Sequence, residues 1–478
     1  MKSKKMIALA VAMAMSSTMG VFAENTTPIE GKAALAGTET TVNIQSSTGQ
    51  NASKEKPANP APPEAPGGQQ PPAGPQSQGK DISAFTAAKI VDGSTEELSD
   101  SFVADQADQN SLLVKNGANV TVKNSAFDKS GNTTSGDGSN FNGQNATILS
   151  SNSTVSIDGC SIKSNADGAN AVFSTGSASK VTVHDTNIRT KGNSSRGLDA
   201  TYGGTVTANN INIGTEGAHC AALATDRGEG TVTVSQSTLN TAGEGSPVVY
   251  STGNITLTES KGTATGSEIA VIEGKNSINL EYVDLTGSQK HGVMLYQSFS
   301  GDAGVGTASF SAKHSSLHNK SDGPMFYVTN TKARAYLEMT DLEFSSPTLI
   351  QVTSDQWGNA GSNGGDFTFV ANQQALSGNV LANHISKVAL SLENGSTWTG
   401  AINGDNAAAA ATVSIDSSST WTVNGTCYIT ALTDADTTLS NITGNGNTIY
   451  YTASNEANQW LGGKTYDLSG GGQLKPVV

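Results

Sequence analysis

Apolar residues recur along this chain in an eight-residue pattern that alternates twice and resumes after a short gap. With h for an apolar residue and x for any residue, the pattern is h-x-h-x-x-x-x-h. It occurs as VTVKNSAF (120–127), VSIDGCSI (155–162), VTVHDTNI (181–188), VTANNINI (206–213), VTVSQSTL (232–239), ITLTESKG (255–262, with Gly262 in the last apolar place), INLEYVDL (278–285), FSAKHSSL (310–317) and LEMTDLEF (337–344). A period of two with β-branched residues is typical of strands, not helices. Each octad therefore predicts a strand, a tight bend and a second short strand.

The octads follow one another at the spacing of one structural repeat. Most of them start 23 to 27 residues after the previous one, and further apolar stretches lie between them, such as AVFST (171–175) and PVVYS (247–251). One such repeat cannot bury its own apolar face, whereas stacked repeats share a continuous core. We therefore expect an all-β parallel β-helix of about fourteen coils, roughly 65 Å long at a strand spacing of about 4.8 Å.

Two positions of the octad predict how each coil is built. The third position should point inward and gives a ladder of Val, Ile and Leu at residues 122, 157, 183, 208, 234, 257, 280, 312 and 339, with Ala208, Ala312 and Met339 as variants. The fifth position should lie in the bend, where Asn124, Asp185 and Asn210 tolerate left-handed backbone angles.

The first 80 residues differ from the rest in composition. MKSKK and the apolar run after it, with Val21 and Ala23 at the −3 and −1 positions of a cleavage site, predict a secretory signal peptide at 1–23. Residues 24–80 contain nine of the 13 prolines, eight of them between positions 57 and 75, and predict a disordered Pro/Gly/Gln-rich spacer. Because no later stretch is apolar enough for a membrane helix, we expect no membrane span after signal removal. The protein should be secreted, either extracellular or at a cell surface.

The remaining chain, residues 81–478, is expected to form the β-helix. Regular coils should occupy 110–345, and less regular C-terminal coils and a cap should occupy 346–478. In this second part the phrase Ser-Thr-Trp recurs, with Trp398 and Trp421 separated by 23 residues, which is again one coil.

The C-terminal coils resemble a known class of β-helix. The stretch from DSSSTWTVNG to LTDADTTLSN (416–441) is similar to the end of β-helical passenger domains of autotransporter adhesins, where a Ser-x-Trp-x-Val-x-Gly phrase recurs. More broadly, residues 110–450 resemble the pectin-lyase-like superfamily, which implies a right-handed coil. Autotransporters end in a membrane barrel, but only 46 residues follow Leu432, so we expect no translocator barrel in them.

Charge and cysteine content narrow the classes of partner. Without the signal peptide the chain has 24 basic and 41 acidic side chains, a net charge of −17, which argues against nucleic acid as a partner. The three cysteines, Cys160, Cys220 and Cys427, are too few and too scattered for a disulfide framework. We expect them to be buried and unpaired.

The pectin-lyase-like resemblance also makes an enzyme conceivable. It would imply the polygalacturonase motifs Asn-Thr-Asp, Asp-Asp, Gly-His-Gly and Arg-Ile-Lys, or the pectate-lyase motifs Trp-Ile-Asp-His and Arg-x-Pro-x-x-Arg. The sequence contains none of these, and Lys290-His291-Gly292 is the nearest approach to one. This absence favours a protein without catalysis.

Carboxylate spacing points the same way. Glycoside hydrolysis needs two carboxylates about 5 to 9.5 Å apart, whereas Asp199 and Glu273 should lie three coils apart, roughly 14 Å. Arg196 with Asp226 and Arg227 could supply a lyase base and a calcium ligand, although solvated turns carry such charges as well. We therefore identify no catalytic residue.

A binding ladder is the better-supported site. When the coils are aligned by the apolar stretch before each octad, with slips of a residue or two, Asp199, Tyr250, Glu273, Tyr296 and Tyr327 stand at similar positions of nearby coils. Aromatic rings beside hydrogen-bonding acids suit sugar rings. The alternative is that these side chains only stack across strands and stabilise the sheet.

A long segment interrupts the coil rhythm at SDQWGNAGSNGGDFTF (354–369). Insertions in solenoids often bind partners, so Trp357 is a candidate contact residue. Asp355 and Asp366 could hold calcium, but the Gly-Gly-x-Gly-x-Asp calcium repeat is absent. We expect no cofactor, with calcium as the one alternative.

These observations predict a function in surface binding. The first hypothesis is a secreted adhesin, or a protein that binds a polysaccharide or a host or cell-surface component without catalysis. The second is a lyase or glycoside hydrolase acting on an acidic polysaccharide such as pectin, with acidic and basic side chains from neighbouring coils converging in one groove. The third is a purely structural surface-layer protein.

Overall fold

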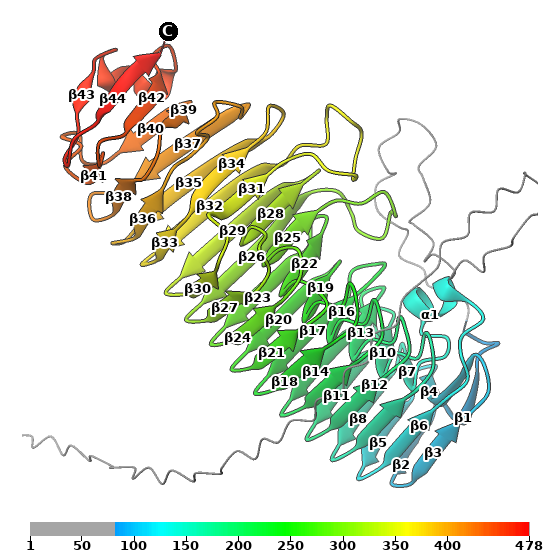
Figure 1. Cartoon of the computed structure of the whole chain (residues 1–478). Coiled ribbons are helices and arrows are strands. Elements are labelled where there is room, and N and C mark those ends of the chain that lie inside the picture. The colour runs from blue at the N-terminus through cyan, green and yellow to red at the C-terminus, as the bar shows by residue number, and fades with distance from the viewer. Residues whose placement is uncertain (1–81, 478) are drawn as a thin grey trace, which may run out of the picture. The chain divides into compact units, whose positions relative to one another are not determined.

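The computed structural model describes residues 82–477, so the predicted signal peptide and the whole predicted spacer lie outside the described residues. The described chain is a parallel β-solenoid of about 16 turns, close to the fourteen coils expected (Figure 1). This confirms the predicted all-β repeat fold.

Three long sheets, here called A, B and C, run along the solenoid, and each coil contributes one strand to each sheet over most of its length. Sheet A contains β1 (Thr86–Asp92), β4 (Gln109–Lys115), β7 (Ile148–Ser151), β10 (Val172–Thr175), β13 (Leu198–Thr201), β16 (Leu223–Thr225), β19 (Val249–Ser251), β22 (Ala270–Glu273), β25 (Val293–Tyr296), β28 (Phe326–Thr329), β31 (Thr348–Val352) and β34 (Asn379–Ala382). Sheet B contains β2 (Thr95–Leu98), β5 (Asn119–Lys123), β8 (Thr154–Asp158), β11 (Lys180–His184), β14 (Thr205–Asn209), β17 (Thr231–Ser235), β20 (Asn254–Thr258), β23 (Ser277–Glu281), β26 (Thr307–Lys313), β29 (Lys332–Glu338), β32 (Asp366–Asn372), β35 (Lys387–Glu393), β37 (Ala410–Ile415) and β40 (Ala431–Asp434). Sheet C contains β3 (Ser101–Ala104), β6 (Ala126–Lys129), β9 (Ser161–Ser164), β12 (Asn187–Thr190), β15 (Asn212–Thr215), β18 (Thr238–Thr241), β21 (Lys261–Ala264), β24 (Asp284–Gly287), β27 (Ser316–Asn319) and β30 (Asp341–Phe344).

Two smaller sheets and two helices complete the described chain. Sheet D contains β33 (Ala375–Ser377), β36 (Thr397–Gly400), β38 (Thr420–Val423) and β41 (Ile442–Thr443). Sheet E contains β39 (Cys427–Ile429), β42 (Thr448–Thr452), β43 (Tyr466–Asp467) and β44 (Gln473–Val477). The helices are α1 (Gly136–Asn142) and the 3₁₀ turn η1 (Glu456–Leu461). The antiparallel pair β43–β44 ends the parallel stacking.

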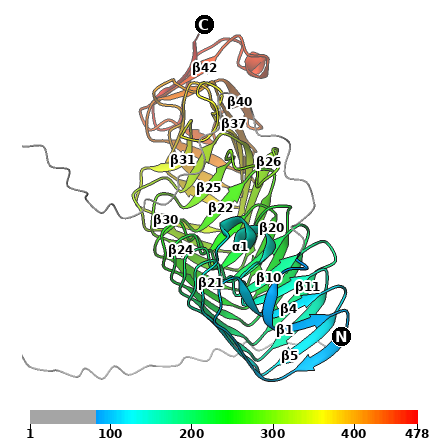
Figure 2. The same cartoon turned by 90° about the vertical axis from the view of Figure 1, so that its right-hand side faces the viewer.

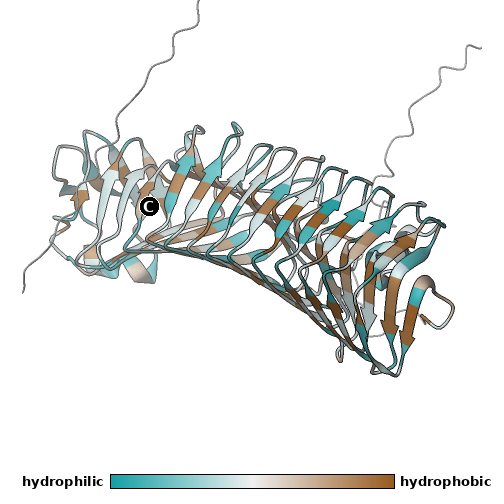
Figure 3. Cartoon of the chain, turned by 90° about the horizontal axis from the view of Figure 1, so that it is seen from below, coloured by the Kyte–Doolittle hydropathy of each residue, from teal (hydrophilic) through white to brown (hydrophobic). Residues whose placement is uncertain are grey.

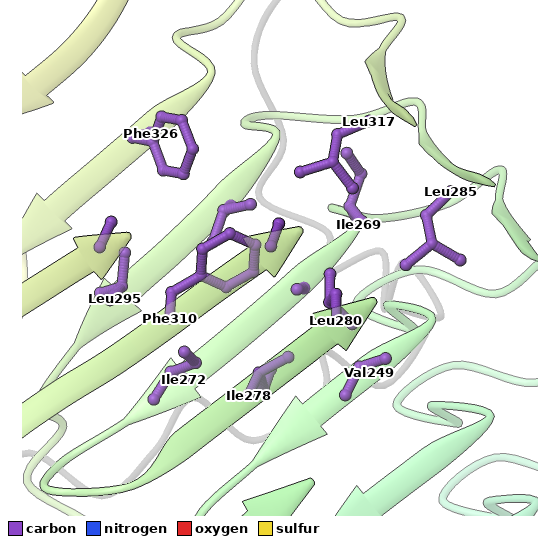
Figure 4. Packing of buried hydrophobic residues seen from close by; sticks show 14 of the residues in the cluster. Val249, Ile269, Ile272, Ile278, Leu280, Leu285, Leu295, Phe310, Leu317 and Phe326 are labelled. Carbon is purple, nitrogen blue, oxygen red and sulfur yellow. The ribbon is translucent and has the colours of Figure 1, made fainter. Parts of the chain in front are cut away.

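Stacking in register explains why the octads resemble one another. In sheet B, Val181 pairs with Val206, which pairs with Val232 on the next coil. Each inward position therefore meets a similar apolar side chain above and below, and the core is continuous along the axis. Figure 3 shows apolar positions recurring on successive strands, and Figure 4 shows Ile278, Leu280 and Phe310 within the core.

The C-terminal coils keep the same logic with larger side chains. Trp398 and Trp421 are paired in sheet D and stack with ring centroids 4.9 Å apart, as their 23-residue spacing predicts. Both are fully buried, and their indole N–H groups donate to the carbonyl oxygens of Gly378 and Gly400. The three cysteines are buried and unpaired, as expected.

The bends between sheets B and C follow the predicted backbone chemistry. Asn124, Asp185 and Asn210 have φ angles of 49°, 49° and 51°, which confirms left-handed angles at the fifth octad position. The same position is left-handed in later coils, and there it holds bulkier residues.

The expected inward position of Met339 is wrong. β29 pairs with β26 so that Leu337 lies opposite Ala312, and Leu337, not Met339, occupies the core ladder. Met339 is in the bend with φ 46° and is 52% exposed. A shift of two residues preserves the inward–outward alternation, so the apolar pattern alone does not distinguish the two alignments.

Three segments outside the regular coils lie near the outer face of sheet A. The first is the segment 130–147, which contains α1 and rests against this face (Figure 2). The other two follow sheet A strands, at 297–306 after β25 and 353–365 after β31. The first two segments contact Arg196 and Arg227 on this face, and the third contacts Tyr296 and Tyr327.

Candidate functional site

The predicted ladder lies on the outer face of sheet A, in two adjacent columns. Asp199, Ala224 and Tyr250 follow one another in one column, and Tyr327 stands further along it. Glu273 and Tyr296 pair in the neighbouring column, two residues further along their strands. The sequence alignment, which allowed slips of a residue or two, predicted one ladder. The structure places these residues on one face of the sheet but divides them between two columns.

Glu273 is the centre of a hydrogen-bonded network in this ladder. The Tyr250 hydroxyl donates to Glu273 Oε2 at 2.9 Å, and the Tyr296 hydroxyl donates to the same atom at 3.0 Å. The Ser298 hydroxyl donates to Oε1. Burial raises the pKa of Glu273, and the bonds from Ser298 and Tyr250 oppose the rise. Because only hydroxyl and amide groups bond to it, this acid is satisfied without a cation.

Of the two remaining candidates, Trp357 packs against this network and Tyr327 has other partners. Trp357 contacts Tyr296 with ring centroids 5.3 Å apart. The Tyr327 hydroxyl donates to Asp355 Oδ2 at 2.8 Å, and its ring stacks on His291 at 4.0 Å. Four of the six candidates, Tyr250, Glu273, Tyr296 and Trp357, are therefore joined by direct contacts, whereas Tyr327 bonds to Asp355 and Asp199 belongs to a separate ionic group.

That group is built on one arginine between two carboxylates. Arg196 Nη2 lies 3.0 Å from Asp226 Oδ2, and Arg196 Nη1 lies 3.6 Å from Asp199 Oδ2. Neither oxygen of Asp199 accepts a hydrogen bond of ordinary geometry, although the nearby Ala200 N–H also acts to lower the pKa of this carboxyl group. Burial raises the pKa of Asp199 to about 6 against the opposing effect of Arg196, and burial raises the pKa of Asp226 well above its usual range.

The segment with α1 covers this ionic group. Arg196 Nη1 donates to Asn140 Oδ1 at 3.1 Å, and the Thr201 hydroxyl donates to the Phe141 carbonyl oxygen at 3.0 Å. Arg227 lies over the Phe141 ring at 3.7 Å and forms an ion pair of 2.6 Å with Asp302 in the 297–306 segment. Both flanking segments thus meet at Arg227.

No sequence pattern predicts this cover. Asp199 points outward from its coil, as expected, yet it is 0% exposed and is not part of a solvated turn. Glu273, Tyr296 and Tyr327 are also buried, whereas Tyr250 and Trp357 are partly exposed. The ladder exists, but most of it is covered, so a large ligand cannot lie along it in this conformation.

An open groove lies elsewhere, at the bends between sheets B and C. It is shallow, and Ser237, Ser260 and Val283 are among the residues that line it, together with Gln236, Thr238, Glu259, Lys261, Tyr282, Asp284 and His314. Tyr282 is 56% exposed, and its ring stacks on His314 with centroids 5.0 Å apart and planes 9° apart. His314 comes from the following coil, so the other face of Tyr282 looks toward the coil of Glu259 and forms a wall of the groove.

The backbone at this wall is unusual. Tyr282 and His314 occupy the fifth octad position with φ 54° and 48°, a left-handed conformation that bulky residues rarely adopt. Sequence reasoning did not identify these residues, although the signal was present. The octad alignment itself shows an aromatic ring at a position where Asn and Asp are expected.

A second hollow lies between the 297–306 and 353–365 segments. Its lining includes Phe299, Lys332, Asp366 and Lys387. Asp355, the other acid considered for calcium, bonds to Tyr327 instead. Within residues 82–477 no three His, Cys, Asp or Glu side chains are grouped so that they could hold a metal ion.

Comparison with known proteins adds no assignment. No protein-family model, curated protein or solved structure matches the chain significantly. Over residues 82–477, neither helix has the length and apolar character that crossing a membrane would require.

Proposed function

We propose that this chain is a secreted surface-binding protein that recognises a glycan of a host or another cell without catalysing a reaction on it. It would be an adhesin of the right-handed, pectin-lyase-like β-helix type, presented at the end of the Pro-rich spacer. The groove at the bends between sheets B and C is the binding surface that we assign to it.

One observation carries this proposal, the exposed ring of Tyr282 held in a left-handed bend. A left-handed backbone costs about 1–2 kcal/mol for a residue with a side chain, and Asn bears it more easily. More than half of Tyr282 is exposed, so its ring contributes to the wall of the groove through its stack on His314 and is not part of the core. Outliers of this kind are concentrated at functional sites.

The chemistry of the groove suits a sugar. The free face of Tyr282 offers an apolar plane on which a sugar ring can stack. Gln236, Glu259 and Lys261 around it offer hydrogen-bond donors and acceptors for hydroxyl groups. Gln236 already donates to Glu259 at 2.9 Å, which fixes both side chains before a ligand arrives.

The test is binding of the purified protein to an immobilised panel of glycans and host matrix proteins. We expect Tyr282→Asn to lose binding while its thermal midpoint is unchanged or higher. The matched control is Met339→Asn, which relieves the same backbone conformation outside the groove and should keep binding. Equal binding by wild type and Tyr282→Asn, or no binding by wild type to any ligand of the panel, would refute the proposal.

The second candidate function is cleavage of an acidic polysaccharide at the sheet A cluster. The convergence of Arg196, Asp199 and Asp226 within 3.0 to 3.6 Å favours it, since acidic and basic side chains of neighbouring coils do meet there. It ranks second because Asp199 is inaccessible and Glu273 lies three coils away. Release of reducing ends or unsaturated products from polygalacturonate, abolished by Asp199→Asn, would reverse this ranking.

A further inference from the structure

The second hollow, between the 297–306 and 353–365 segments, is a cavity that the proposed function does not use. Its volume is about 540 Å³, within the range of about 300–1,000 Å³ that is typical of ligand sites. Phe299, Val305 and Ile385 give it apolar walls, and Asn359 and Ser362 add polar groups. Val305 is 46% exposed, so this part of the lining is open to solvent. The hollow therefore has the size and the mixed lining of a binding site.

Three charged side chains from successive coils form one column in this hollow. Lys332 pairs with Asp366, and Asp366 pairs with Lys387, at the first positions of β29, β32 and β35. All three are exposed, and all three line the hollow. With neighbouring strands about 4.8 Å apart, the two lysines start about 10 Å from each other, and the carboxylate stands between them. The column thus presents a positive, a negative and a positive charge in that order.

Positive charge is in excess around this column. Neither lysine forms an ion pair within residues 82–477, and Asp366 can neutralise only one of them. Arg334 lies two residues after Lys332 on the same face of β29, and its strand neighbours Ser309 and Thr368 are uncharged. The whole chain has a net charge of −14. A local excess of positive charge on such a protein indicates an anionic partner.

We propose that this hollow is a second binding site, separate from the groove at Tyr282, for a linear acidic glycan with a carboxylate on every second sugar ring. Two carboxylates of the glycan meet Lys332 and Lys387, and a hydroxyl group of the neutral ring between them donates to Asp366. The apolar face of a sugar ring rests on Phe299. A glycan with a carboxylate on every ring is disfavoured, because it brings a like charge to Asp366.

The test compares three hexasaccharides by isothermal titration calorimetry on the full chain at pH 7.5 and low ionic strength, where charge interactions are least screened. The protein carries Tyr282→Asn, so that the groove does not contribute. The hyaluronan hexasaccharide has a carboxylate on every second ring, hexagalacturonate has one on every ring, and chitohexaose has none. We expect the hyaluronan hexasaccharide to bind most tightly, although hexagalacturonate has twice its charge. Equal or tighter binding of either other probe would overturn the proposal.

Variants in the same background assign the binding to the charged column. Lys332→Gln combined with Lys387→Gln should weaken binding of the hyaluronan hexasaccharide about tenfold, through the loss of two exposed ion pairs. Lys163→Gln, the matched loss of an exposed lysine on sheet C, should leave binding as it was. Asp366→Asn should remove the preference over hexagalacturonate, because the like charge is then gone. Unchanged binding by the double lysine variant, or a preference that survives Asp366→Asn, would overturn the assignment.

The hollow and the groove can fail independently. Binding of the hyaluronan hexasaccharide that is equal in wild type and Tyr282→Asn, and weakened in the double lysine variant, belongs to the hollow. The groove is judged on the panel ligands whose binding the double lysine variant retains. Loss of hyaluronan binding in Tyr282→Asn alone would overturn the assignment of this ligand to the hollow and leave the groove intact.

Discussion

Asp199→Asn should stabilise the protein, although it removes half of an ion pair. The substitution keeps the size of the side chain and removes a charge that is 0% exposed. Arg196 keeps its closer partner Asp226 at 3.0 Å. The gain should depend on pH, because the charge of Asp199 depends on pH.

The sign and size of the effect follow from the shift in pKa. In the unfolded chain an Asp releases its proton at about pH 4, whereas burial in the fold raises the pKa of Asp199 to about 6. Between these values the folded state binds more protons, so the free energy of unfolding falls as the pH rises. At about 1.36 kcal/mol for each pKa unit, the loss reaches about 3 kcal/mol above pH 6. Asn mimics the protonated acid, so the variant should gain up to about 3 kcal/mol at pH 7.5 and nothing at pH 4.

Hydrogen exchange is the suitable assay, since solenoids open coil by coil and a global midpoint averages over many coils. Amides of β13 and β16 should be better protected in Asp199→Asn than in wild type at pH 7.5, after correction for intrinsic rates, and equally protected at pH 4. The control is Asp128→Asn, an exposed acid on sheet C that should change neither. A variant that is less protected at pH 7.5, or a difference of the same size at both pH values, would refute the reasoning.

Three further predictions concern the core. Gly262→Leu completes the octad pattern, yet it should lower the thermal midpoint and reduce the free energy of unfolding by about 1–3 kcal/mol. The reason is that an added Cβ would lie 2.9 Å from Val248 Cγ1. An unchanged or higher midpoint would contradict this prediction. Trp421→Ala should cost about 3–5 kcal/mol and expose sheet D to proteolysis, whereas intact protease resistance would show that the stacked pair is dispensable. Burial raises the pKa of Cys220 to about 11 and that of Cys427 to about 12. Both thiols should therefore resist a thiol reagent at pH 8 until urea unfolds the chain. Labelling of either thiol in the native state would refute their burial.

The sequence was sufficient for most of the fold because of how a solenoid is stabilised. Every strand pairs with the equivalent strand of the next coil, so a pattern that repeats in sequence also repeats in space. Val181, Val206 and Val232 could be aligned by inspection, and they are neighbours in sheet B. The left-handed bends at Asn124 and Asn210 were equally accessible, since few side chains tolerate that conformation.

The sequence could not predict the contacts between segments that do not repeat. α1 covers Arg196 from a position 56 residues earlier in the chain, and no periodic signal marks that contact. Asp302 meets Arg227 across 75 residues for the same reason. The burial of Asp199 follows from these insertions, so its altered acidity could not be foreseen from its own coil.

Tyr282 and Asp199 share a property that links stability to function in this solenoid. Tyr282 occupies a bend where Asn would be more relaxed, and Asp199 occupies a covered position where Asn would carry no charge. In both cases the residue present is locally less favourable than the residue that the repeat would accept, and neither is needed to form its coil. A repeat makes such departures visible because its other coils show what the position tolerates. Natural sequences retain local conflicts of this kind mainly where a site needs them. Tyr282→Asn should therefore raise stability and lose glycan binding together, and Asp199→Asn should raise stability above about pH 6.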